Sequence, residues 1–203
     1  MTDIFRGATA VRQAVADYLS VAVPIVAAQA RDDWMMTEIQ LPDVVKYDAY
    51  EPYALDMWPL IGINVTNAND FIRVDIDDDG GNQYLAKYNV RVFTWIRTPM
   101  DADDTPLEPE YSESLRLRDD LAAVVRAALL KTGSLGQRAI IFDETTLTED
   151  YSEATKVKGD RWVAGTIHSF TIRLDESVPL VPLGTANTIT IVGLISTDLE
   201  VGS

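Results

Sequence analysis

The sequence contains no cysteine, and its single histidine is His168. Without cysteine the chain can form no disulfide, no thiolate nucleophile and no cysteine-based zinc site. A zinc site built on two or three imidazoles is also excluded within one chain, and a Ser-His-Asp relay could use only His168. These absences remove several classes of enzyme and favour a protein that is made in a reducing compartment.

His168 lies in the segment RWVAGTIHSFTIRLDE, whose alternation of apolar and polar residues is typical of a strand. Every second position of this segment belongs to the more apolar face of that strand. His168 is part of this set, which also contains Trp162, Ala164, Thr166, Phe170, Ile172 and Leu174. We therefore interpret His168 as a hydrogen-bonded packing residue rather than a catalytic one.

Basic residues are few, because 17 lysines and arginines stand against 32 acids and give a net charge of −15. A domain-sized basic surface is not expected, so tight binding to a nucleic-acid backbone is disfavoured. The apolar N-terminal stretch is interrupted by Asp3, Arg6, Arg12 and Asp17, unlike a signal peptide or a membrane span. We expect a soluble protein of cytosolic origin without a membrane partner.

The usual catalytic motifs are missing as well. The sequence has no G-x-x-x-x-G-K-[ST] phosphate loop, no G-x-G-x-x-G after a strand, and no G-x-S-x-G nucleophile turn. We predict that the protein is not an enzyme. No catalytic, cofactor-binding or metal-ligating residue is predicted, and no cofactor.

The stretch VDIDDDGGNQY begins like a calcium-binding loop, with Asp75, Asp77 and Asp79 at alternate positions before Gly80. The twelfth position of such a loop should be a glutamate that binds the ion through two oxygens, but here it is Ala86. The flanking residues alternate like strands rather than helices. The stretch therefore predicts a β-hairpin whose tip is Asp-Asp-Gly-Gly.

Two readings of this acidic stretch remain open as alternatives. A small module that binds a divalent cation could use the loop Asp75–Asp79. Two carboxylates at this spacing after an apolar strand could also hold a metal ion and a nucleotide diphosphate, as in sugar transferases. No nucleotide-binding motif in the sequence supports this second reading.

Two helices are predicted from the spacing of apolar residues. The first covers about residues 8–30, and Pro24 should kink it or begin a second short helix. The second is YSESLRLRDDLAAVVRAALLKTG, with Gly133 as a plausible stop. Its predicted buried stripe consists of Leu117, Leu121, Val124, Ala128 and Leu129.

Strands are predicted from alternation and β-branched residues. The first begins near ALDMWPLIGINV, where Pro59 argues for an edge position or a bulge, and a separate strand, DFIRVDI, follows it. The remaining strands are YLAKYNVRVFTWIRT, RAIIFDETTL and RWVAGTIHSFTIRLDE. The connecting segments 37–53, 99–113 and 148–160 are expected to be irregular.

The chain changes character after residue 178. The segment SVPLVPLGTAN is rich in proline and extended, and it leads to the apolar, β-prone TITIVGLIS. This last strand could fold back on its own sheet or add to the edge of a neighbour's sheet. We predict one α+β domain over residues 1–178 and an extended C-terminal arm over residues 179–203.

The order of these elements resembles that of the tail terminator proteins of long-tailed (siphovirus-type) bacteriophages and their neck-region relatives. The likeness covers roughly residues 8–176 and depends on order and spacing rather than on a signature motif. Its main segments are WPLIGINV, YNVRVFTWIRT, an acidic loop, SLRLRDDLAAVVRAALL and RWVAGTIHSFTIRLDE. The arm after Pro179 departs from the compact pattern of the family.

The resemblance implies a mixed or antiparallel sheet packed against the two main helices. It also implies a homo-oligomeric ring, commonly a hexamer, that caps the tail tube, ends tube polymerisation and presents a surface for head-tail joining. Its partners would be other copies of the chain, the tail tube protein and a head-tail connector or stopper protein. The protein would be assembled in the host cytoplasm and reside in the virion, and DNA would pass through the ring without specific binding. Another neck, head-completion or tail-completion role remains the nearest alternative.

Overall fold

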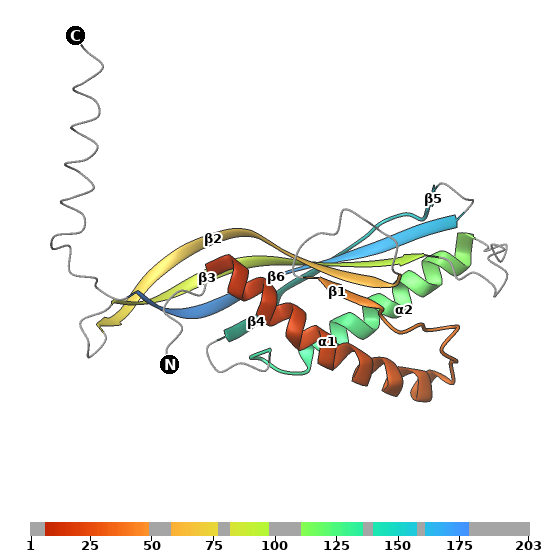
Figure 1. Cartoon of the computed structure of the whole chain (residues 1–203), viewed down its shortest axis with the longest axis horizontal. Coiled ribbons are helices and arrows are strands. Elements are labelled where there is room, and N and C mark those ends of the chain that lie inside the picture. The colour runs from red at the N-terminus through yellow and green to blue at the C-terminus, as the bar shows by residue number, and fades with distance from the viewer. Residues whose placement is uncertain are drawn as a thin grey trace, which may run out of the picture.

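In the part of the chain that the structure describes, a mixed sheet of six strands forms one layer and two helices form the other (Figure 1). The computed structural model describes residues 7–48, 58–76, 82–97, 111–135, 140–157 and 161–178. The helices are α1 (Gly7–Trp34) and α2 (Tyr111–Leu130). The strands are β1 (Lys46–Asp48), β2 (Leu60–Ile76), β3 (Asn82–Arg97), β4 (Ile140–Tyr151), β5 (Thr155–Val157) and β6 (Arg161–Val178). The predicted α+β architecture is confirmed.

The strands lie in the order β1-β2-β3-β6-β4, and β5 also pairs with β6. Strand β1 is parallel to β2, and every other pairing is antiparallel. The three long strands β2, β3 and β6 therefore form the centre of the sheet. Both helices lie on the same face of it (Figure 1).

The main core lies between the helices and one face of the sheet. Cross-strand pairs such as Val92–His168, Val90–Phe170 and Tyr88–Ile172 face the helices. The buried stripe of α2 packs against them, as its spacing predicts: Leu117, Leu121, Val124, Ala128 and Leu129 are all buried. This alternation of buried and open positions is what a sheet with one covered face requires.

Helix α1 continues without interruption through Pro24, so the alternative of a second helix that starts there is wrong. The side chain of Pro24 is exposed, whereas Val23, Ala27 and Ala30 continue the buried stripe on the other side of the helix. Packing of this stripe outweighs the loss of one backbone hydrogen bond at the proline.

Strand β2 is a single strand of 17 residues, not the two strands that the sequence suggests. Its pairing with β3 shifts register at three places: Val65/Asn67, Asn69/Ile72 and Arg73/Asp75. The bulges keep the polar residues between the two apolar halves paired with β3, so the strand does not end there. Pro59 lies immediately before the strand, where it needs no ladder hydrogen bond.

Two segments expected to be irregular contain short strands. Strand β1 falls in the segment 37–53, while the end of β4 and all of β5 fall in the segment 148–160. In β4 the polar residues Thr148 and Glu149 pair with Ser169 and His168. The Thr148 hydroxyl donates a hydrogen bond to the carbonyl oxygen of Ser169, and the Glu149 carboxylate lies beside His168. The polar composition of the segment does not show these contacts.

The hairpin predicted around the acidic stretch is confirmed in its strands. Ile76 of β2 pairs with Asn82 of β3 in antiparallel register. The predicted tip, Asp78, Asp79, Gly80 and Gly81, lies outside the described residues, as do Asp77 and the side chain of Asp75. The predicted arm over residues 179–203 also lies outside them.

Candidate interaction surfaces

Large apolar side chains are exposed at several places in the described part of the protein, and two groups of them also border a hollow. One group follows the outer side of α1 and the end of α2, and consists of Val21, Ile25, Trp34, Met35 and Leu130. The other lies on β2 near its hairpin and consists of Phe71 and Ile72. Contiguous exposed apolar surface commonly marks an interaction site, whereas a single exposed apolar residue does not. The two places are therefore the candidate functional sites.

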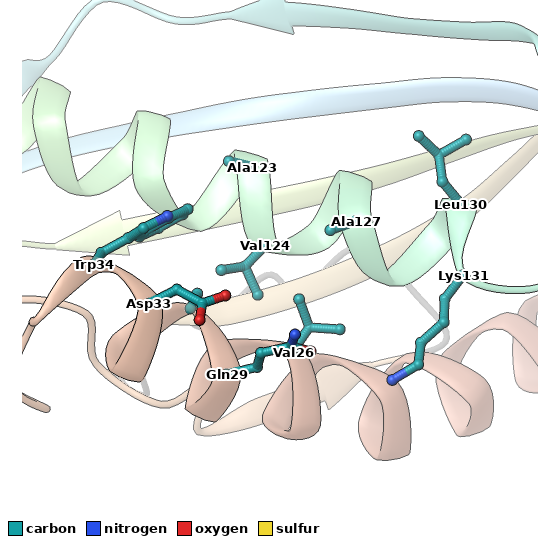
Figure 2. A pocket seen from close by; sticks show the side chains of 10 residues that line it. Val26, Gln29, Asp33, Trp34, Ala123, Val124, Ala127, Leu130 and Lys131 are labelled. Atoms are coloured by element: carbon teal, nitrogen blue, oxygen red, sulfur yellow. The ribbon is translucent and has the colours of Figure 1, made fainter.

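The helix groove is a hollow of about 390 Å³ between α1 and α2. Figure 2 shows side chains from both helices converging on it. Its apolar lining consists of Val26, Ala30, Trp34, Ala123, Val124, Ala127 and Leu130. Gln29, Asp33 and Lys131 provide polar groups. Alanines at the facing positions leave this space open, because a larger side chain would fill it.

The spacing of the two helices is fixed at one end of the groove. The hydroxyl of Tyr18 donates a hydrogen bond of 2.7 Å to the carbonyl oxygen of Ala128. The hydroxyl of Thr132 donates in turn to the Tyr18 oxygen, at 3.3 Å. These contacts tie α1 to the last turn of α2, so the groove is a preformed feature rather than a gap between loosely packed helices.

The hairpin end is the surface formed by Asp70, Phe71, Ile72, Lys87 and Arg173. The backbone of Asp70 is in the left-handed region, with φ of 53°, at the register shift between Asn69 and Ile72. Phe71 and Ile72 are 55% and 59% exposed. They border a hollow of about 250 Å³ that Leu85, Lys87 and Arg173 also line. The bulge thus directs an aromatic and an aliphatic side chain away from the sheet.

The sheet face away from the helices is polar at its centre. A hollow of about 260 Å³ is lined there by residues that include Thr66, Asn89, Arg91 and Thr171. The hydroxyl of Thr171 donates to the side-chain oxygen of Asn89 at 3.2 Å. Lys87, Arg91 and Arg173 lie on this face. Lys87 forms an ion pair with Asp70 at 3.7 Å. The pKa of Asp143 is lowered by a hydrogen bond from Thr145 and also by the nearby Arg173 and Lys87, so the charges of this face are partly balanced within the chain.

His168 lies in the core between α2 and the sheet and has no exposed surface. Its Nε2 atom forms a hydrogen bond of 3.2 Å with the carbonyl oxygen of Ala122 and lies 3.2 Å from Oε1 of Glu149. Burial lowers the pKa of His168, although the nearby carboxylate of Glu149 opposes this shift. The prediction of a hydrogen-bonded packing histidine is confirmed.

Glu149 connects His168 to the surface. Its Oε2 atom accepts hydrogen bonds from Arg126 at 2.7 Å and from the hydroxyl of Tyr151 at 2.6 Å. Neither the sequence of β4 nor that of α2 shows this network, because its members are separated along the chain. The only part of the network that the sequence indicates is the buried position of His168, which follows from the alternation of its strand.

Charged residues of α2 that could have served a subunit contact are largely engaged within the chain. Arg116 forms ion pairs with Glu113 and Asp120. Arg118 forms an ion pair with Asp119 and donates a hydrogen bond to the carbonyl oxygen of Ser152. These bonds favour a role for the charges in the stability of α2.

Among the described residues, no group of three or more histidine, aspartate or glutamate side chains is arranged to hold a metal ion. The acidic tip of the hairpin lies outside those residues, so the cation-binding alternative stays a prediction. In the same part of the chain, α1 alone is long and apolar enough to cross a membrane, with a mean hydropathy of 1.3. A helix packed in a protein core meets the same criterion, and the buried side of α1 packs in the core of this fold. No protein-family model and no curated protein matches the chain.

Proposed function

We propose that the chain is a structural protein of a phage virion that forms a homo-oligomeric ring at the head-proximal end of the tail tube. The ring ends tube polymerisation and offers a surface to the connector or stopper protein of the head. The observation that carries this proposal is the presence of two different exposed apolar surfaces, the helix groove and the hairpin end, on one small domain.

The arrangement of elements is compatible with the resemblance on which the proposal draws. The segments that carry the resemblance fall on β2, β3, α2 and β6, which together form the centre of the sheet and its helical cover. The helix-strand-strand-helix-strand order expected from the resemblance agrees with the order of the main elements.

Two unlike surfaces on one chain favour a ring over a two-fold dimer. In a two-fold dimer the same patch of each subunit meets itself. When one patch meets a different patch, the contact is head-to-tail, and the pair of copies still has one unused patch of each kind. Such contacts close into a ring when the rotation between neighbours allows it, which is the assembly that a tube end requires.

The charge of the chain is compatible with a channel for DNA. With a net charge of −15, most of the surface repels a phosphate backbone. DNA that is ejected through such a ring would meet few strong binding sites on its walls. Another component of the neck or of tail completion would draw on the same surfaces and is the second candidate.

Light scattering combined with negative-stain imaging tests the proposal. We expect annular particles with a central hole, either for the purified chain or after its addition to purified tail tubes of the same virus. Co-sedimentation should place the protein at one end of each tube. A chain that stays monomeric at high concentration and does not bind tubes would exclude this function.

A further inference from the structure

We propose that the hairpin end of one copy docks into the helix groove of the next copy and forms the repeated contact of the ring. The inference rests on the proposed ring and adds the two surfaces that meet within it. It assigns Phe71 and Ile72 as the inserted side chains and the α1–α2 pair as their receptor.

The hairpin end has the properties of an inserted element. A left-handed backbone at a non-glycine residue is unfavourable, and Asp70 adopts it at a bulge of β2. The result is that Phe71 and Ile72 stand adjacent to each other and more than half exposed. Bulges that redirect side chains are commonly found where those side chains are used. Aromatic anchors of this kind dominate the energetics of many protein interfaces.

The helix groove has the properties of a receptor. Its volume of about 390 Å³ lies in the range of preformed binding pockets, and most of its lining is apolar. The Tyr18–Ala128 hydrogen bond holds the two helices at a fixed spacing. An aromatic and a branched aliphatic side chain would fill the groove without requiring the helices to move apart.

Charges at the two surfaces are complementary in one orientation. Asp33 and Lys131 lie at opposite ends of the groove, as Figure 2 shows. At the hairpin end, Asp70 belongs to β2 and Arg173 to β6, with β3 between them. The acid and the cation are therefore separated by roughly two strand spacings, about 10 Å. Within the chain Asp70 forms a solvent-exposed ion pair with Lys87, at 3.7 Å, which docking would replace. An orientation that places Arg173 beside Asp33 and Asp70 beside Lys131 would bring opposite charges together at both ends of the groove.

The contact has to form between two copies. Strands β2 and β3 continue from the body of the sheet into the hairpin end, which extends beyond the start of α1 (Figure 1). The groove lies farther along the helical layer and is formed by the second half of α1 and the second half of α2. One copy cannot bring its own hairpin end to its own groove without leaving the sheet.

The absence of cysteine makes a cross-linking test specific. Phe71→Cys and Ala127→Cys are prepared as separate variants, mixed, and treated with a short bis-maleimide. We expect a covalent dimer in the mixture and none in either variant alone. A mixture of Phe71→Cys with Val45→Cys is the matched control, because Val45 is 59% exposed and belongs to neither surface. It should stay uncross-linked.

The outcomes separate this inference from the proposed ring. Cross-linking of Phe71→Cys to itself as readily as to Ala127→Cys would indicate a contact between like surfaces and overturn the inference. An uncross-linked mixture in which light scattering and imaging still show rings would overturn the inference but leave the ring. A wild-type chain that forms no ring, alone or on tail tubes, would overturn both.

Discussion

The Nε2 atom of His168 lies 3.2 Å from Oε1 of Glu149, in the layer between α2 and the sheet. The histidine is fully buried, whereas the carboxylate is held from the surface side by Arg126 and Tyr151. One buried imidazole thus joins the backbone of α2 to the edge strand β4. The stability of the protein should depend on both groups.

We expect stability to decrease on acidification through His168. Burial lowers its pKa in the folded protein, so the unfolded chain binds the proton more readily. The contribution of neutral His168 is therefore complete above the unfolded pKa of about 6.5 and is lost as the pH falls below it. Urea unfolding of the wild type and of His168→Gln at pH 7.5 and pH 5.5 measures this effect. The difference between the two proteins should change with pH, and an unchanged difference would contradict the assignment.

Removal of Glu149 should destabilise the protein by about 1–3 kcal/mol, because two donors lose their acceptor and His168 loses a neighbouring charge. The free energy of unfolding of Glu149→Ala checks this value. Glu153→Ala is the control, since Glu153 is exposed and its loss should change stability by less than about 0.5 kcal/mol. Equal effects of the two substitutions would show that the network contributes nothing.

Gly165→Ala should be destabilising by about 1–3 kcal/mol through overpacking. A Cβ atom at this position would lie 2.8 Å from Cε3 of Trp95 and 2.9 Å from the carbonyl oxygen of Thr94. The backbone oxygen cannot move without disturbing the pairing of β3 with β6. Gly133→Ala is the matched control, because a Cβ there meets nothing within 4 Å. Thermal unfolding of both variants compares them directly, and equal melting temperatures would contradict the prediction.

Phe71→Asp should abolish the ring and leave the fold intact. The side chain is 55% exposed, so its loss removes little from the core, but a carboxylate would be buried in the apolar groove of the neighbour. Light scattering should show the mass of the monomer, and circular dichroism an unchanged spectrum. Val45→Asp introduces the same charge at a site outside both surfaces and should still form rings. Rings of normal mass from Phe71→Asp would exclude the docking contact.

The sequence predicts α2 and the centre of the sheet well, because their burial follows a simple period. The five residues of the predicted α2 stripe are all buried, and so are six of the seven residues of the predicted apolar face around His168, all but Trp162. The prediction of two strands in place of β2 is wrong because the largely polar run from Thr66 to Asn69 interrupts the apolar alternation. Bulges keep this run paired, and their positions depend on the neighbouring strand.

The candidate surfaces were not predictable from the sequence. Alternation along β2 cannot indicate where Phe71 points, because the register shift at Asn69/Ile72 breaks the period. The helix groove depends on how α1 and α2 cross, and its alanines look like ordinary core positions in each helix alone. Contacts between distant segments decide both features.

Strand β1 covers only the first three residues of β2, from Leu60 to Gly62, and β2 then shifts register against β3, on its other side, at three places. Bulges bend and twist the strand that contains them, so the uncovered side of β2 is a poor template for a foreign strand. In the described part of the chain, fibrillar stacking at this edge is thereby discouraged. A protein whose proposed role needs many copies in one cell could accumulate to high concentration and remain available for ordered assembly.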